Sequence, residues 1–386
     1  MNQIERKVVI IGGGAAGMAA AVSGAKKVGG SQVCVLEKNS FLGRKLLATG
    51  NGRCNFTNIN CDKSPQILDF FEGLGVLHRV ESQGRAYPYT EQAVTVQQAL
   101  LDEIKGLQIQ CICNSVDIHI QNDQDGFDVL VTEKDTGEKW RIKSENLMIA
   151  TGGKAGVQYG CTGDGYVYAA NFGHKLVKPI PSLVQLTCKD PIFKELKGVR
   201  SKAFVSLWCD GEKIDGELGE VQFTQEGLSG ICIFNISRHL RLSKEVPSYD
   251  KFTIVIDLMP QFSLEDVKRR LGADLEKNLK GMIHSKLLPV VLSKAKKMKG
   301  KGTLSEKVAQ ILKGWQIPIS GTKSWKEAQV TSGGIPLCEV HLDRMESKLR
   351  KNLYFAGEVL DFDGKCGGYN LQWAWETGLL AGNSIR

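Results

Sequence analysis

Gly-Gly-Gly-Ala-Ala-Gly at residues 12–17 follows the apolar run Lys7–Ile11 directly and opens an alanine-rich stretch that extends to about residue 27. A second run rich in β-branched residues, Gln32–Leu36, comes next and is followed at once by Glu37. Short apolar runs of this kind are typical of strands buried on both faces of a parallel sheet, and alanine favours a helix. The sequence therefore predicts a complete β-turn-α-β unit within about 30 residues.

The glycines of this turn have the spacing of a dinucleotide-binding motif. Gly12 permits a tight turn, Gly14 lets the backbone approach a pyrophosphate, and Gly17 lets the helix pack closely on the strand. The start of the helix also offers free N–H groups and a partial positive charge to phosphates. Glu37 lies 25 positions beyond Gly12, close to the ~20-residue spacing of a ribose-binding acid, and an acid there disfavours a 2′-phosphate. We therefore expect FAD or NAD rather than NADP at this turn.

The residues after Glu37 favour FAD. An NAD dehydrogenase would normally continue into another βα unit, whereas residues 43–55 read Gly-Arg-Lys-Leu-Leu-Ala-Thr-Gly-Asn-Gly-Arg-Cys-Asn. This run is too polar and too rich in glycine for an ordinary crossover, and it suits a segment that wraps a long, bent cofactor. Arg44 and Lys45 are available as charge-assisted donors to phosphate oxygens.

The C-terminal region is predicted to complete the FAD site. Gly357 and Glu358 follow an apolar strand, and residues 367–372, Gly-Gly-Tyr-Asn-Leu-Gln, open a last helix. The start of that helix would face the N1/O2 edge of the flavin, which carries negative charge when the flavin is reduced. Glu358 and Asp361 are candidates to accept hydrogen bonds from the ribityl hydroxyls, or are solvated loop acids.

The pattern of the chain changes twice along its 386 residues, a length roughly twice the ~100–200 residues of one ordinary domain. Short alternating strands, with a turn predicted at Asp210-Gly211, begin near Leu183. A Lys- and Leu-rich helical stretch follows, which we expect Pro289, Gly300 and Gly302 to break. The first pattern resumes near Val330. The predicted segments are a FAD-binding domain at 1–182 and 331–386, a β-rich domain at 183–262 and 314–330, and a helical subdomain at 263–313.

The composition predicts a soluble, core-forming protein. Hydrophobic residues make up 42% and charged residues 24% of the chain, which excludes a disordered chain. No stretch approaches the ~20 apolar residues of a membrane span, and the short polar N-terminus leaves no room for a secretory leader. With eleven scattered cysteines, we expect reduced thiols in a cytoplasmic protein without a membrane partner.

The net charge of +8 is mild for this length and mostly dispersed. A basic cluster near residue 297 is interpreted as a solvated helix end or, alternatively, as a contact for an anionic substrate or partner. No aromatic platform or recognition helix accompanies it, so we do not expect a nucleic-acid partner, and the oligomeric state is not indicated. The cluster consists of Lys294, Lys296, Lys297, Lys299 and Lys301.

Candidate catalytic residues are few, and the catalytic group stays unassigned. Tyr369 is a candidate to donate a proton to a reduced enone, or packs as a ring beside the flavin. Cys54 and Cys366 would need Cα atoms within about 7 Å to form a redox pair. The histidines lack metal-ligand spacing, so no metal site is expected. No nucleophile–His–acid set is present, and hydrolase chemistry is not indicated.

The run at residues 43–55 resembles the hallmark of the BaiN-like (YhiN-type) NAD(P)/FAD-dependent oxidoreductases. This family includes 3-dehydro-bile acid delta(4,6)-reductase and aminoacetone-oxidase-like flavoproteins. Segments 150–153 with 162–166, 223–230 and 331–372 resemble the family too, so the resemblance covers essentially the whole chain. It implies an α/β fold: a two-segment FAD-binding Rossmann-like domain, interrupted by a β-barrel-like domain that carries a helical insertion. The chain departs from the family at Lys365-Cys366, where Tyr-Thr is frequent.

The motifs and the resemblance together imply a set of cofactor-binding residues, in which the backbone of Val116 would meet the adenine. The set is Gly12, Gly14, Ala16, Gly17, Glu37, Lys38, Arg44, Lys45, Asn51, Val116, Thr151, Gly152, Gly357, Glu358, Asp361, Gly368, Asn370 and Leu371.

We therefore expect an FAD-dependent oxidoreductase that passes hydride from NAD(P)H, through flavin N5, to a C=C bond conjugated to a carbonyl. The resemblance implies a 3-oxo bile-acid or steroid-type small-molecule acceptor. No second complete dinucleotide motif is present, so NAD(P)H is expected as a transient donor. One alternative is an amine or aminoketone oxidase that uses oxygen. Another is a non-catalytic FAD-holding module for redox sensing or tRNA-related partner binding.

Overall fold

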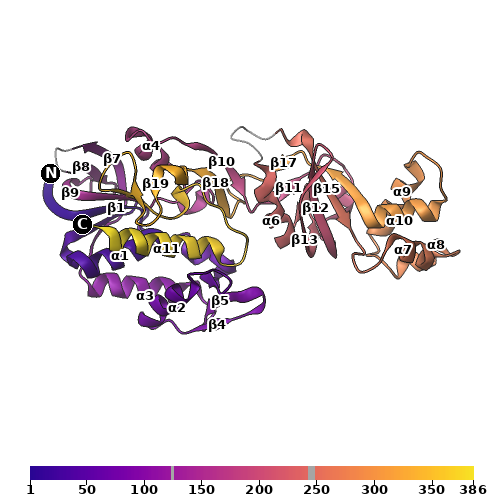
Figure 1. The fold of residues 1–386 in the computed structure, drawn as a ribbon, viewed down its shortest axis with the longest axis horizontal. Coiled ribbons are helices and arrows are strands. Elements are labelled where there is room, and N and C mark those ends of the chain that lie inside the picture. Colours follow the sequence, from indigo (N-terminus) through magenta and orange to yellow (C-terminus); the bar gives the residue numbers. More distant parts are fainter. Residues whose placement is uncertain (123–125, 242–247) are drawn as a thin grey trace. The chain divides into compact units, whose positions relative to one another are not determined.

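The computed structural model describes residues 1–122, 126–241 and 248–386 (Figure 1). The chain divides into two compact units. The first unit comprises Met1–Ile180 and Val330–Arg386, and the second unit comprises Pro181–Gln329. Each unit has its own hydrophobic core. Among the described residues, no helix combines the length and the apolar character needed to cross a membrane.

A mixed sheet with parallel strands at its middle forms the centre of the first unit. Strand β1 (Asn2–Ile11) lies between β2 (Val33–Leu36) and β9 (Lys139–Ile149), parallel to both. The strand order is β19-β20-β21-β9-β1-β2-β6, and the antiparallel pair β7–β8 joins at β9. The predicted β-turn-α-β unit is confirmed, and β1 begins earlier than predicted because its polar first residues pair with β9. The other strands of this sheet are β6 (Gln110–Ile112), β7 (Ser115–Asn122), β8 (Phe127–Glu133), β19 (Val340–His341), β20 (Glu346–Ser347) and β21 (Leu353–Phe355).

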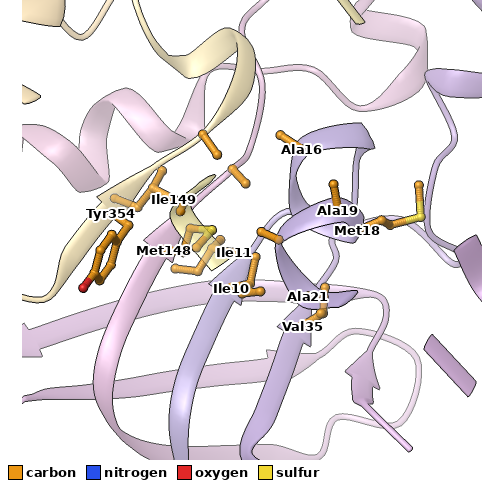
Figure 2. Packing of buried hydrophobic residues seen from close by; sticks show 14 of the residues in the cluster. Ile10, Ile11, Ala16, Met18, Ala19, Ala21, Val35, Met148, Ile149 and Tyr354 are labelled. Atoms are coloured by element: carbon orange, nitrogen blue, oxygen red, sulfur yellow. The ribbon is translucent and has the colours of Figure 1, made fainter. Parts of the chain in front are cut away.

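Strand residues and alanines build the core of this unit. Ile10, Val35 and Ile149 are fully buried, and Figure 2 shows them with Ala16 and Ala19 of helix α1 (Ala15–Val28). Small side chains on α1 allow a close approach of the C-terminal helix α11 (Tyr369–Ser384), which lies beside it (Figure 1). The first and last segments of the first unit therefore share one core.

Glycines of α11 make that approach possible. A Cβ at Gly378 would lie 2.3 Å from the Ala16 carbonyl oxygen, and one at Gly382 would lie 2.0 Å from Ser23 Oγ. Both distances are far shorter than a van der Waals contact, so neither position accommodates a side chain without movement of α1. The remaining elements of this unit are α2 (Ser64–Gly73), α3 (Ala93–Gly106), α4 (Asp164–Asn171), β3 (Thr57–Asn58), β4 (His78–Val80), β5 (Arg85–Pro88) and β18 (Val330–Gly334), and β18 pairs with β10 (Val177–Ser182).

The second unit is built on an antiparallel sheet with the order β16-β15-β12-β13-β14-β11-β17. The predicted turn at Asp210-Gly211 joins β12 to β13, and both residues have positive φ, as a two-residue hairpin turn requires. Among the described residues the sheet does not close, so the expected barrel-like domain is an open sheet. Its strands are β11 (Leu186–Thr187), β12 (Arg200–Cys209), β13 (Glu212–Phe223), β14 (Gly227–Ser229), β15 (Phe252–Asp257), β16 (Trp315–Pro318) and β17 (Gly321–Thr322).

Six helices accompany this sheet in the described part of the second unit. The expected break at Pro289 is wrong, because Pro289 lies inside helix α9, in its first turn, where a proline removes no intrahelical hydrogen bond. Gly300 and Gly302, both with positive φ, lie between α9 and α10. The helices are α5 (Phe193–Leu196), α6 (Ile231–Ser237), α7 (Leu264–Leu271), α8 (Leu275–Lys280), α9 (Leu287–Lys297) and α10 (Leu304–Gly314). The predicted α/β fold with a two-segment Rossmann-like sheet is confirmed.

Candidate functional site

The glycine turn between β1 and α1 has the geometry that a dinucleotide cradle needs. Gly12 has φ +106°, and a Cβ there would lie 2.5 Å from the Ala150 carbonyl oxygen. A Cβ at Gly17 would lie 1.8 Å from the Gly12 carbonyl oxygen, so the helix packs on the turn with no room for a side chain. A Cβ at Gly14, in contrast, would meet no atom within 4 Å. The open side of the turn is therefore at Gly14, next to the first N–H groups of α1.

A second open glycine lies at the end of the adjacent strand. Thr151 and Gly152 follow β9, and the Gly12 turn packs against Thr151 Cα. Gly152 has φ +71°, and a Cβ there would also meet nothing within 4 Å. Ligands of open α/β sheets bind outside the carboxyl ends of the strands. Gly14 and Gly152 therefore leave the backbone accessible at the edge where a nucleotide is expected.

The buried carboxylate of Glu37 accepts hydrogen bonds from residues at this edge of the sheet. Its Oε2 accepts a hydrogen bond from Gly13 N at 2.8 Å. Its Oε1 accepts bonds from Asn39 N at 2.8 Å and from Asn39 Nδ2 at 2.7 Å. Its backbone oxygen accepts a bond from Ser115 N at 2.9 Å, which places Val116 beside it. The carboxylate can accept about four bonds in all, so it shapes the turn and keeps capacity for a ribose hydroxyl.

An ion pair joins the segment after β2 to the C-terminal part of the first unit. Lys45 Nζ lies 2.7 Å from Glu358 Oε2, and both side chains are less than one-third exposed. Burial opposes the charge of the Lys45 ammonium, but the Glu358 carboxylate outweighs it, and the pKa of Lys45 is raised. Lys45 therefore stays positively charged at the site.

Thr331 holds the other oxygen of Glu358. Thr331 N donates to Glu358 Oε1 at 2.9 Å, while Thr331 Oγ1 accepts bonds from Lys154 N at 2.8 Å and Ala155 N at 3.0 Å. This threonine connects the loop after β9 to Glu358. Our sequence reasoning missed this role, and that of Asn39, because no local pattern marks either residue; both depend on tertiary contacts.

Residues 54–58 pack against the start of α11. Asn58 Nδ2 donates to Gly367 O at 2.8 Å, and Trp375 Nε1 donates to Phe56 O at 2.9 Å. The Asn55 amide, oriented to satisfy both of its groups, accepts from Gly368 N at 3.2 Å. Thr57 and Gln372 also share a side-chain hydrogen bond. The glycine-rich segment and the tail helix therefore pack together.

The C-terminal segment contributes its backbone conformation to the site more than side chains that are available to bind a ligand. Gly368 has φ +98°, and a Cβ there would lie 2.4 Å from the Thr57 carbonyl oxygen. Asn370 is occupied within its own loop, where its side chain accepts from Gly364 N at 2.8 Å and donates to Gly364 O at 2.9 Å. Leu371 packs against the core, and Asp361 N donates to Ile335 O at 2.8 Å. Gly357 N donates to Thr377 Oγ1 at 2.9 Å.

The other predicted contact residues are Lys38, Arg44, Ala16 and Asn51. Lys38 Nζ bonds Thr162 Oγ1 and Asp164 Oδ2, both at 2.6 Å. Arg44 donates to Asn39 Oδ1 at 3.0 Å. Ala16 is buried in α1. Asn51 is exposed, with φ +56°, and no hydrogen bond of its side chain joins it to the rest within the described residues.

The structure describes both catalytic candidates. Cys54 is fully buried, and burial raises the pKa of its thiol to about 12, so the sulfur is protonated. Tyr369 is half-buried as the first residue of α11. No cysteine among the described residues takes part in a disulfide. Within the described residues, no group of three or more His, Cys, Asp or Glu side chains is arranged to hold a metal ion.

Comparison with known proteins places this site in context. The model of the family described as HI0933-like protein Rossmann domain matches residues 6–66 and 62–384. The chain is 32% identical to the 3-dehydro-bile acid delta(4,6)-reductase of Clostridium scindens, with 98% of each chain covered. It is 28% identical to the ribosomal RNA dihydrouridine synthase of Haemophilus influenzae, again with 98% of each covered.

One solved structure of similar fold is the FrdA chain of the E. coli quinol fumarate reductase. It has a TM-score of 0.50 at 14% identity, over 100% of this chain and 70% of that one. At this identity the likeness concerns the fold alone.

Proposed function

The chain belongs to the HI0933-like family, a family of FAD-dependent oxidoreductases, and on that premise we propose that it reduces a C=C bond conjugated to a carbonyl group. The observation that carries the proposal is the Lys45–Glu358 ion pair, which joins the glycine-rich segment after β2 to the C-terminal segment, together with the open glycine turn. Such a junction suits a cofactor long enough to reach both parts. FAD would supply the hydride transfer, taking hydride from NAD(P)H at N5 and delivering it to the acceptor.

In this proposal, residues of the first unit would contact FAD along its length. The N-terminus of α1 and the open side of Gly14 would hold the pyrophosphate. Glu37 and the neighbouring backbone of Val116 would hold the adenosine end. Lys45 would neutralise phosphate or flavin charge, and Glu358 would keep it oriented.

The start of α11 would act at the opposite end of the cofactor. Gly368 caps this helix, and its first N–H groups and dipole would stabilise negative charge on the reduced ring. Tyr369, the first residue of the helix, is the candidate proton donor to the acceptor. Cys54 is a packing residue in this proposal because its thiol is buried and protonated.

The leading acceptor is a 3-oxo bile-acid or steroid-type enone. The relative from C. scindens is named for reduction at delta(4,6) of a 3-dehydro bile acid, and a ketone conjugated to these double bonds makes them electrophilic. A hydride adds to the carbon far from the carbonyl, a proton adds next to the carbonyl, and NAD(P)⁺ is released. The inserted second unit would contribute to acceptor choice.

The test is turnover of purified protein with NADH or NADPH and a panel of 3-oxo-Δ4 and 3-oxo-Δ4,6 bile acids. We expect products heavier by two hydrogens, one of them deuterium when the donor is deuterated at the transferred position. No product across the panel would remove the steroid acceptor. Hydrogen peroxide formed from an amine or aminoketone without NAD(P)H would support the oxidase alternative instead.

A second candidate acceptor is uracil within RNA. Its C5=C6 bond is also conjugated to a carbonyl, and saturation of that bond gives the dihydrouridine for which the H. influenzae relative is named. The specific observation in its favour is the charge of the second unit. Residues 181–329 contain 25 Lys and Arg against 17 Asp and Glu, whereas the rest of the chain contains 25 of each.

A further inference from the structure

The whole net charge of this protein resides in the second unit. The counts above give the first unit no net charge and the second unit the full +8. Within the second unit the charge is concentrated further, since residues 277–326 contain 12 lysines and a single acid, Glu306. Charge dispersed evenly over the surface would not be confined to one unit. Its concentration in the second unit therefore requires a physical explanation.

Two lysine-bearing segments distant in sequence are joined by hydrogen bonds. Lys294 Nζ bonds Asp190 Oδ2 at 2.9 Å, and Lys286 Nζ bonds the Lys197 carbonyl oxygen at 3.3 Å. These two bonds hold residues 189–197, around α5, against α9. We name the lysine face as residues 189–197, α9 with the preceding Lys286, and the following segment 298–301. Its lysines are Lys189, Lys194, Lys197, Lys286, Lys294, Lys296, Lys297, Lys299 and Lys301.

Acidic partners are scarce on this face. Asp190 is engaged by Lys294, and the nearby Lys307 bonds the Met298 carbonyl oxygen at 2.8 Å. Four further lysines of the face are exposed and have no ion pair among the described residues; they are Lys296, Lys297, Lys299 and Lys301. Besides Asp190, which also attracts Lys297, the residues of the face include one other acid, Glu195. The four ammonium groups within six residues therefore repel one another, and an anionic partner would relieve that repulsion.

The side chains of the lysine face indicate which kind of anion it would bind. Every large apolar side chain in residues 189–197 and 286–301, prolines aside, is buried or half-buried. Helices that bind membranes expose such side chains for insertion into the lipid, so a bilayer is a poor match. Lysine ammonium groups without an apolar or aromatic component bind phosphates as point charges and read no base. An aromatic platform is needed for stacking on bases, not for contact with a phosphate backbone.

We propose that the lysine face is a docking surface for the phosphate backbone of a structured RNA. The proposal deepens the second candidate acceptor and in that sense rests on the proposed function, because it names the surface that would hold an RNA whose uracil is reduced elsewhere. It also revises the expectation that nucleic acid is not a partner, which depended on an absence of base-reading groups.

The experiment measures binding and needs no turnover. FAD-loaded full-length protein is titrated into a fluorescein-labelled RNA stem-loop at several salt concentrations, without NAD(P)H, and anisotropy is recorded. The main variant replaces Lys296, Lys297, Lys299 and Lys301 by Gln. The matched control replaces four exposed lysines of the first unit, Lys105, Lys134, Lys139 and Lys351, by Gln. A third variant carries Arg at the four positions of the lysine face.

We expect the unaltered protein to bind the stem-loop with a linear dependence of log K on log salt. The Gln variant of the lysine face should bind more than about tenfold more weakly at low salt. Its slope should be shallower by about 3 to 4, roughly 0.9 for each phosphate that a lysine no longer neutralises. The control and the Arg variant should keep binding within about twofold, and all variants should keep their FAD.

Three results would overturn the proposal. They are no RNA binding at low salt, equal weakening in the lysine-face and control variants, and equal or tighter binding of polyglutamate or of anionic phosphatidylglycerol vesicles. The failure of the proposed function is a separate result. It would appear as a flavin that neither NAD(P)H nor an acceptor changes, whatever the RNA affinity.

Discussion

Lys45 and Glu358 form an ion pair, Nζ to Oε2 at 2.7 Å, although 313 positions separate them in the chain. The pair joins the glycine-rich segment after β2 to the C-terminal part of the first unit. Thr331 holds the second carboxylate oxygen through its backbone N–H. Two segments from opposite ends of the sequence therefore build one edge of the site, and a ligand that contacts both depends on this pair.

Removal of the Lys45 charge should weaken FAD binding. In Lys45→Met the Glu358 carboxylate loses its partner and would lie near cofactor phosphates. Hydrogen bonds to charged groups contribute about 1.5–3 kcal/mol, so we expect the Kd for FAD to rise about ten- to a hundredfold. Fluorescence titration of the apoprotein with FAD measures this Kd.

The control for this variant is a different ion pair, which joins the start of α2 to α11. Lys63 Nζ lies 2.7 Å from Glu376 Oε1, with the lysine more than half exposed. Exposed pairs contribute about 0–1 kcal/mol, so Lys63→Met should leave the Kd for FAD nearly unchanged. Equal effects of the two substitutions would contradict a role for Lys45 at the cofactor.

The stability of the protein should depend on the close packing of α1 against α11. In Gly378→Ala the new Cβ would lie 2.3 Å from the Ala16 carbonyl oxygen, a backbone atom that cannot move without α1. Overpacking of this kind costs about 1–3 kcal/mol, and we expect a lower Tm. Gly106→Ala, at the end of α3 where a Cβ meets nothing within 4 Å, is the control and should be neutral or slightly stabilising. A Tm of Gly378→Ala at or above the unaltered value would refute the packing argument.

His174 should make stability depend on pH. It is buried between Glu339 Oε2 at 3.0 Å and Ser347 Oγ at 2.7 Å. Burial lowers the pKa of His174 below its usual value, and Glu339 opposes that effect only in part. Below about pH 6.5 the unfolded chain binds a proton more readily than the folded one, so the free energy of unfolding should fall as the solution is acidified.

Urea unfolding between about pH 5 and pH 8 measures this contribution of His174. His174→Gln should lower stability at every pH and flatten its decrease below about pH 6.5. The exposed His119→Gln serves as the control and should keep the slope of the unaltered protein. An unchanged slope in His174→Gln would show that other groups cause the acid sensitivity.

Cys54 should be chemically inert in the folded protein. Its thiol is fully buried, and burial raises its pKa to about 12. Iodoacetamide at neutral pH should therefore modify the exposed Cys338 and spare Cys54. Cys54→Ala should keep the reductase rate within about twofold. Labelling of Cys54 in the folded protein, or loss of turnover in Cys54→Ala with FAD still bound, would make this cysteine a catalytic candidate again.

Much of the fold could be predicted because its determinants are local. Gly17 is dictated by a close backbone contact with Gly12 within the β-turn-α unit, Gly12 by the positive φ of the turn, and the turn at Asp210-Gly211 by the φ angles of a hairpin. The role of Thr331 could not be predicted, because it arises only when distant segments meet. Pro289 does not break its helix, because the effect of a proline depends on its distance from the start of the helix, which composition does not give.

The candidate site, like the fold, could be predicted from the sequence only in part. The sequence marks Glu37 as a ribose ligand, but the structure shows its carboxylate already bound by Gly13 and Asn39. The charge of the lysine face is likewise visible in the sequence, but the contact between α9 and the segment around Asp190 is a tertiary one. Charge patterns therefore gain meaning only when the fold shows which lysines share a surface.

The most direct test of FAD-dependent reduction is an anaerobic titration of the purified flavoprotein, monitored by its visible absorbance. We expect the protein to carry FAD, to lose the flavin absorbance on addition of NADH or NADPH, and to regain it on addition of an acceptor with a carbonyl-conjugated C=C bond. A colourless protein that takes up no FAD, or a bound flavin that NAD(P)H leaves oxidised, would contradict it.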